Sequence, residues 1–367
     1  MEINRDITLS MRGLAILSIS LHNFIHKAIW GYAQQNELKF DVDNTWTFFE
    51  HISKDCSFFT IIAESISFVG WFGVPVFVFL SGYGLMMKYK DKSMLLDRGQ
   101  KFAYIKHNYT KLLLLTLPAA VFFVIPFLIS GYWSRVAEML FSLTFLNSLF
   151  SGIIIDLHYI TPSFWYFSLA FQLYIVFLII RKASRLNFWF WGGVFLLIQM
   201  LINPAVFGQK PIGYMHYNFI AWLPLFLSGI LTAKEELSLK TNLLFLGIIV
   251  LISIPVIIVM NMNYYSWVLM PFVCVAFFFS LSKVLYIYKV SRLIPIWLGK
   301  NSMYIFVSHP IAIYLVLMIM EKCQTNGLVI HLPLALAIYF LLTISVVFIY
   351  KYVHQSLSVF LKKMRFL

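Results

Sequence analysis

The sequence predicts an all-α polytopic membrane protein with about ten transmembrane helices and with both termini in the cytoplasm. Three observations lead to this prediction. Of the 367 residues, 61% are hydrophobic and only 12% are charged, whereas soluble domains carry about 25% charged residues. Apolar stretches of about 20 residues, the length that crosses a bilayer, recur along the whole chain. Lysine and arginine gather in alternate connecting segments, as the positive-inside rule requires.

The apolar stretches define the predicted spans in chain order. They cover residues 8–30, 67–87, 110–132, 163–181, 187–207, 217–233, 242–260, 264–284, 301–320 and 333–351. Longer connections are predicted at 31–66, which we interpret as a loop, and around the basic stretch 88–106. Residues 133–162 are half apolar, and we interpret them as an interfacial or re-entrant segment because an eleventh span would upset the charge distribution. With no internal repeat, residues 1–367 are expected to form one integral-membrane domain.

The basic residues give the predicted orientation. Of the 28 lysines and arginines, 22 fall in segments that this topology places in the cytoplasm. The six in outer segments are Lys27, Lys39, Lys54, Arg135, Lys210 and Lys322. The formal net charge of +13 is therefore explained mainly by topology, and we expect no nucleic-acid partner because the charges form no single aromatic-interleaved platform.

Ionisable side chains interrupt the first span. Arg12 lies near its cytoplasmic start and His22 lies ten residues further on, which is roughly 15 Å deeper in a helix. Ionisable groups at such depth are costly and indicate a functional site or a hydrogen bond between helices. His26 follows one turn later, where an amphipathic ring at the outer interface is the favoured interpretation.

Other catalytic motifs are absent from the sequence. It contains no G-x-S-x-G, no phosphate loop ending in G-K-[ST], no H-E-x-x-H and no zinc-like cysteine and histidine array. We therefore expect neither a metal cofactor nor a covalent serine mechanism.

Several stretches, taken in order, resemble the signatures of the membrane-bound acyltransferase-3 family. They are "RGLAILSISLHNF" (12–24), "GVPVFVFLSGYGLMMK" (73–88), "FAYIKHNYTKLLLLTLP" (102–118), "SFWYFSLAFQLYIVFLII" (163–180), "WLPLFLSGILTAK" (222–234) and "LGKNSMYIFVSHPIAIY" (298–314). The "FLSGYGL" and "GKNSMYIFVSHP" stretches are the most specific, and the resemblance spans nearly the whole chain.

The resemblance implies an O-acyltransferase that modifies polysaccharide, most often by O-acetylation. The donor would be cytoplasmic acyl-CoA, with acetyl-CoA the usual form, and the acceptor a hydroxyl of a cell-surface glycan or a lipid-linked saccharide. The protein would be multi-pass in the plasma (cell or inner) membrane, surrounded by membrane lipid, with no metal.

The resemblance also implies roles for particular residues. His22 would be the catalytic base, because a neutral imidazole accepts a proton from a hydroxyl. Arg12 would bind the donor's phosphates. Further donor contacts would come from Lys106, Lys111 and Lys300, for which ordinary positive-inside flanking is the competing interpretation. The possible supporting residues are His309, Gln172, Tyr174 and Trp165.

The spacing of Arg12 and His22 departs from the family pattern. The family usually places ten residues between the two, whereas nine intervene here. At about 100° per residue they lie about 80° apart around an ideal helix, so Asn23 shares the face of Arg12. A π-bulge or a non-helical first turn would restore the alignment.

A second departure concerns an acid. The family commonly has a glutamate five residues after its tryptophan, and this chain has Ala170 after Trp165. Either the acid is dispensable, or Glu64 or Asp156 replaces it, or the protein is a non-catalytic glycan exporter on the same scaffold. A lipid-linked sugar polymerase or flippase is a weaker alternative, because the predicted outer segments contain one arginine, Arg135.

Overall fold

The chain folds into helices that belong to two compact units. The computed structural model describes residues 4–28, 38–89, 97–150, 164–235, 242–288, 292–325 and 331–363. Every regular element in these ranges is a helix, which confirms the predicted all-α class. Unit 1 comprises Met1–Phe102 and Gln172–Ser302, and unit 2 comprises Ala103–Phe171 and Met303–Leu367.

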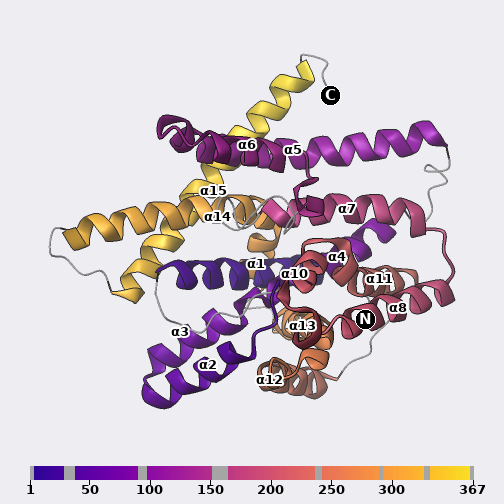
Figure 1. The fold of residues 1–367 in the computed structure, drawn as a ribbon, viewed down its shortest axis with the longest axis horizontal. Coiled ribbons are helices and arrows are strands. Elements are labelled where there is room, and N and C mark those ends of the chain that lie inside the picture. The colour runs from indigo at the N-terminus through magenta and orange to yellow at the C-terminus, as the bar shows by residue number, and fades with distance from the viewer. Residues whose placement is uncertain are drawn as a thin grey trace. The chain divides into compact units, whose positions relative to one another are not determined.

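Unit 1 is built around the N-terminal helix. Its helices are α1 (Arg5–Ala28), α2 (Val42–Lys54), α3 (Phe58–Val69), the 3₁₀ turn η1 (Gly70–Phe72), α4 (Gly73–Tyr89), most of α7 (Phe164–Ile180), α8 (Arg185–Leu201), α9 (Pro204–Phe207), α10 (Gln209–Tyr217), α11 (Phe219–Glu235), α12 (Leu243–Met260) and α13 (Tyr264–Ile287). Helix α1 packs against α3, η1, α4 and α13, while α2 and α3 form a hairpin (Figure 1).

Unit 2 contains most of α5 (Arg98–Ile129), with α6 (Trp133–Ser142), η2 (Asn147–Phe150), α15 (Leu332–Lys363) and most of α14 (Leu293–Thr325). Tyr350 of α15 hydrogen-bonds to the backbone of α5 beside Pro118. Its hydroxyl donates to the Leu115 carbonyl at 2.5 Å and accepts from the Ala119 amide at 3.2 Å. The hydroxyl thus stands in for the Ala119-to-Leu115 backbone bond, next to the proline that interrupts the helix.

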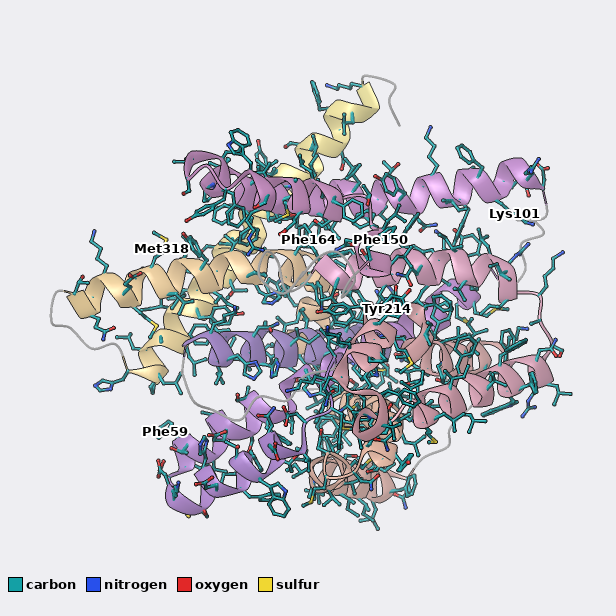
Figure 2. All side chains as sticks on the ribbon, in the orientation of Figure 1. Phe59, Lys101, Phe150, Phe164, Tyr214 and Met318 are labelled. Atoms are coloured by element: carbon teal, nitrogen blue, oxygen red, sulfur yellow. The ribbon has the colours of Figure 1, made fainter. Side chains whose placement is uncertain are left out.

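Each of the ten predicted spans coincides with helical structure where its residues are described. Within the described ranges, six helical stretches are long and apolar enough to cross a membrane. These are Phe58–Tyr89, Arg98–Ile129, Leu243–Met260, Tyr264–Ile287, Leu293–Thr325 and Leu332–Leu361, with shorter apolar helices at Phe164–Ile180 and Phe219–Lys234. Large apolar side chains are exposed on several of them, such as Phe59 and Met318 (Figure 2). Such surfaces suit a lipid environment. The count of ten and the cytoplasmic termini stay predictions.

The prediction of a loop at 31–66 is wrong in its second half. Helix α2 and most of α3 lie there, with Asp41 and Ser57 as N-caps whose side chains accept from the Asp43 and Thr60 amides. Helix α2 is too short and too polar to register as a span. It is stable because Phe48 stacks on Phe68 of α3, with ring centroids 4.7 Å apart.

The described part of 133–162 forms only short helices. Helix α6 spans 10 residues and η2 spans four, whereas a membrane span needs about 20. Residues 151–163, which include Asp156, lie outside the described residues. The interfacial or re-entrant placement of this segment therefore stays a prediction.

Candidate functional site

His22 is buried where α1 meets the turn between α3 and α4. A Cβ atom added to Gly70 would lie 2.4 Å from the His22 Cβ atom, a separation that real Cβ atoms do not tolerate. On the same face of α1, one turn away, the Ser18 hydroxyl donates to the Gly70 carbonyl at 2.7 Å. The glycine thus lets the backbone of η1 approach α1 closely enough to bury the His22 side chain.

One nitrogen of the His22 imidazole hydrogen-bonds to the backbone, and the other has no hydrogen-bond partner among the described residues. Its ring hydrogen-bonds to the backbone carbonyls of Ser67 and Ile66 near the end of α3. Nδ1 is buried and has no hydrogen-bond partner among the described residues, so the nitrogen that donates to the carbonyls is Nε2. The neutral ring therefore keeps its lone pair on Nδ1, which is the atom that a substrate hydroxyl would need to meet.

His26 lies directly against His22. The two ring centroids are 3.8 Å apart and the planes are tilted by 56°. His26 Nε2 donates to the Ser67 carbonyl at 3.0 Å. The placement of the His26 ring at the outer interface stays a prediction. The sequence shows that His22 and His26 are four residues apart, but it does not show the α3 carbonyl to which His26 bonds.

Arg12 lies on α1 away from the face that holds His22. Helix α1 is a continuous α-helix from Arg5 to Ala28, with neither a π-bulge nor a non-helical first turn between the two residues, so the offset of about 80° persists. Arg12 Nη2 lies 3.9 Å from the position of a Cβ atom at Gly84, and the guanidinium interacts electrostatically with Tyr174 of α7. The structure therefore brings Arg12 to Tyr174 and keeps it off the face of His22.

Gln172 connects three helices of unit 1. Its Nε2 donates to Asn218 Oδ1 at 2.9 Å, and its Oε1 accepts from the Phe219 amide at 3.0 Å. This amide clamp fixes α7 against the junction of α10 and α11. Sequence reasoning missed Asn218, which follows α10 as its C-cap. Lys300, in the same unit, is exposed near the start of α14.

His309 of unit 2 replaces a backbone hydrogen-bond donor that α14 lacks at Pro310. Pro310 has no N–H, which leaves the Phe306 carbonyl without its helical donor. His309 Nδ1 lies 2.9 Å from that carbonyl and 3.2 Å from the Ile305 carbonyl. The buried imidazole therefore supplies the missing donor.

The remaining candidate residues of unit 2 differ in exposure. Trp165 is buried in the first turn of α7, and Lys106 and Lys111 are exposed on α5. Asn108 is buried between the two lysines in sequence, and its Nδ2 donates to the Tyr104 carbonyl at 2.9 Å. The amide is thus used within α5, while the two lysines point outward.

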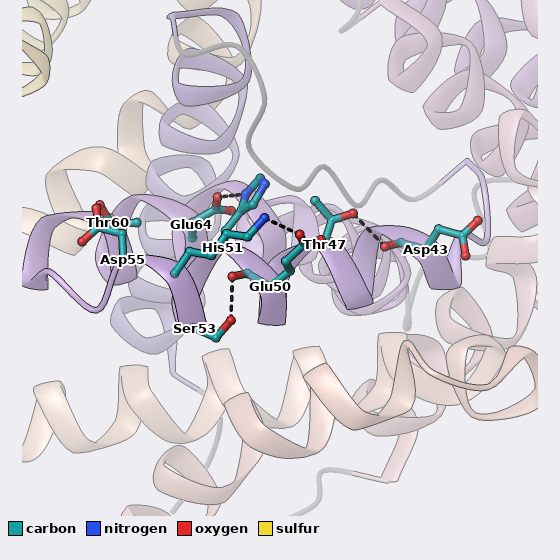
Figure 3. Close-up of polar contacts among 9 residues, drawn as sticks. Asp43, Thr47, Glu50, His51, Ser53, Asp55, Thr60 and Glu64 are labelled. Atoms are coloured by element: carbon teal, nitrogen blue, oxygen red, sulfur yellow. Dashed lines mark hydrogen bonds and ion pairs between the residues drawn. The ribbon is translucent and has the colours of Figure 1, made fainter.

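Glu64, one of the two acids that could replace the missing glutamate, is buried. Ala170 is buried in α7. Glu64 of α3 has no exposed surface, and its Oε1 lies 2.5 Å from Nδ1 of His51 on α2 (Figure 3). Sequence reasoning missed His51, although a glutamate in the apolar run "TIIAESISF" requires a partner.

Nearby, the corner between α2 and α3 is held by Asp55. Hydrogen bonds from Thr60 and Ser57 lower the pKa of the Asp55 carboxyl group, and the contacts are 2.6 and 2.9 Å long. Within the described ranges, no group of three or more histidine, cysteine, aspartate or glutamate side chains could hold a metal ion.

A comparison with known families connects these residues to one chemistry. A family model described as an acyltransferase domain matches residues 10–352. The matched region includes every candidate residue from Arg12 to His309. No curated protein and no solved structure matches the chain.

Proposed function

The chain belongs to the acyltransferase-3 family of membrane proteins, and on that premise we propose that it moves an acyl group, most often acetyl, from cytoplasmic acyl-CoA to a hydroxyl of a cell-surface glycan or lipid-linked saccharide. The observation that most supports a catalytic protein is the buried His22 Nδ1, which no group in the described structure uses. A buried polar atom without a partner needs an explanation, and a substrate hydroxyl supplies one.

In the proposed reaction, His22 acts as general base and then as general acid. Nδ1 takes the proton of the acceptor hydroxyl while its oxygen attacks the thioester carbonyl carbon. The carbon–sulfur bond then breaks, and His22 returns the proton to the departing thiolate. The products are an O-acyl ester and the free thiol, so the imidazole is unchanged after one turnover. General acid–base catalysis of this kind contributes about 100- to 10,000-fold.

In this proposal, positively charged side chains bind the acyl-CoA donor. Arg12, held beside Tyr174 in unit 1, would contact a phosphate of the donor through its guanidinium fork. Lys300 of unit 1 and the exposed Lys106 and Lys111 of unit 2 would add less directional charge near the predicted cytoplasmic ends of their helices. Because Arg12 is off the face of His22, donor binding and proton transfer would use different faces of α1.

A second candidate, a non-catalytic glycan exporter, is favoured by two observations. Ala170 replaces the acid that the resemblance implies, and α1 contains no bulge to align Arg12 with His22. Of the two acids proposed as substitutes, Glu64 lies within the described residues, and its pairing with His51 explains its burial without requiring catalysis.

Mass spectrometry of surface glycans distinguishes the two functions. Cells lacking the protein are complemented with the wild-type chain, with His22→Ala, or with His107→Ala, which changes an exposed histidine, all at matched membrane abundance. We expect wild type and His107→Ala to restore an acyl-sized mass increment, and His22→Ala to reduce it about 100-fold or more. A change in the amount of exported glycan with no change in its acylation would support the exporter and refute the transferase.

A further inference from the structure

Three residues spaced one turn apart attach one face of α1 to α3 and η1. Ser18 donates to the Gly70 carbonyl, His22 donates to the carbonyls at the end of α3, and His26 donates to the Ser67 carbonyl. The i, i+4 spacing places all three on the same face of the helix. Ser18 and His26 therefore make equivalent backbone contacts on either side of His22.

One of these flanking residues, His26, packs its ring against the imidazole of His22. The ring of His26 lies 3.8 Å from that of His22, centroid to centroid. The hydrogen bond from His26 Nε2 to Ser67 fixes the orientation of the His26 ring, and the ring in turn limits rotation of the His22 side chain about χ2. Rotation of His22 by half a turn about χ2 would put Cε1 in the place of Nε2 and Cδ2 in the place of Nδ1. The carbonyls at the end of α3 would then lose the N–H that favours the Nε2–H tautomer.

We propose that His26 is a positioning residue that holds His22 in the Nε2–H tautomer, with the Nδ1 lone pair available to a substrate hydroxyl. The arrangement follows the logic of a catalytic triad, in which a third group orients the base and sets its tautomer. Here the orienting groups are a second histidine and the backbone carbonyls at the end of α3. The catalytic part of this proposal rests on the proposed function, while the tautomer assignment does not.

The tautomer is measured first, without any substrate. The full chain in lipid nanodiscs carries ¹⁵N-labelled histidine, and the His22 ring signals are identified by their loss in His22→Gln. We expect wild type to show a protonated Nε2 and an unprotonated Nδ1. In His26→Ala we expect a mixture of tautomers or an exchanging ring. A His22 ring that keeps one tautomer in His26→Ala would overturn the proposal.

Ser18→Ala is the matched control. It removes a hydrogen bond from α1 to the same backbone segment, at an equal distance along the helix, and leaves the two rings in contact. If His26 only joins two helices, Ser18→Ala and His26→Ala will affect stability and the His22 tautomer alike. We expect both variants to lose thermal stability and only His26→Ala to change the tautomer.

Kinetics of acyl transfer then test the consequence. With labelled acetyl-CoA and base-deacylated surface polysaccharide as probes, we expect His26→Ala to lower kcat about 10- to 100-fold, with the KM for the donor unchanged. This is the loss typical of removing a residue that orients a metal-ligating histidine. His26→Gln, which restores an N–H donor for Ser67, should recover part of kcat. An unchanged kcat in His26→Ala refutes the positioning role. If wild type transfers no acyl group but the tautomer depends on His26, the proposed function fails and the structural assignment stands.

Discussion

At the scale of single residues, the two histidines that best match the family differ in their hydrogen-bond partners. His309 donates to carbonyls of its own helix, whereas His22 reaches across to another helix and keeps Nδ1 available. A histidine that donates locally is explained by the backbone alone. A histidine that bonds to a distant carbonyl and retains a lone pair has a geometry suited to catalysis.

The role of His309 can be tested with a double-mutant cycle. His309→Ala should destabilise the protein, because it leaves the Phe306 carbonyl buried without a donor at a cost of about 1–3 kcal/mol. Pro310→Ala restores a backbone N–H to that carbonyl, so His309→Ala should cost less in the Pro310→Ala background. Thermal unfolding of the four proteins in detergent measures the difference. Equal costs in the two backgrounds would show that His309 is not needed as the substitute donor.

At the scale of elements, the helices of unit 1 approach one another through glycines. Helices α4 and α11 form the most extensive helix pair in the described structure. A Cβ atom at Gly82 would lie 2.2 Å from the Phe226 carbonyl oxygen, and one at Gly229 would lie 2.1 Å from that of Phe79. Small residues at such interfaces are how membrane helices gain close packing.

Gly82→Ala should therefore separate α4 from α11. We expect a loss of about 1–3 kcal/mol of stability, as overpacking commonly causes, seen as a lower unfolding temperature in detergent. Gly193→Ala is the control, since no heavy atom lies within 4 Å of its added Cβ. That substitution should be neutral or stabilising by about 0.5–1 kcal/mol, because alanine favours the helix. Equal behaviour of the two variants would contradict the close approach of α4 and α11.

At the scale of the whole molecule, the predicted topology places the α2–α3 corner outside and the start of α5 inside. Cys56 lies in that corner and is exposed, while Cys274 is buried and Cys323 is partly exposed. Arg98 is exposed at the first position of α5. In this predicted topology the two positions lie on opposite sides of the membrane.

Labelling with a membrane-impermeant maleimide tests this orientation. In a chain with Cys323→Ser, we expect Cys56 to react in intact cells. In a chain with Cys56→Ser and Cys323→Ser, an added Arg98→Cys should react only after the membrane is permeabilised. The reverse pattern would invert the topology, and labelling of both sites in intact cells would place them on the same side.

The properties that the sequence alone determines are local ones. The helical class and the ten apolar segments follow from hydropathy over about 20 residues, and the family resemblance, confirmed over residues 10–352, follows from short ordered motifs. The position of His22 in α1 and the proline-linked contact of His309 also depend on neighbours in sequence. Helix α2 was missed because a capped helix of 13 residues leaves too weak a hydropathy signal.

Only the tertiary structure decided what each buried polar group contacts. His26 bonds to Ser67, 41 residues away, and Gln172 bonds to Asn218, 46 residues away. Such pairs depend on which helix faces meet, and that is set by close packing at glycines such as Gly70. The sequence shows that Glu64 is an acid in an apolar segment and therefore requires a hydrogen-bond or ion-pair partner. Only the packing of α2 on α3 shows that this partner is His51. The sequence therefore indicates where polar groups interrupt the apolar segments, and packing determines which hydrogen-bonding atoms of those groups find a partner in the protein.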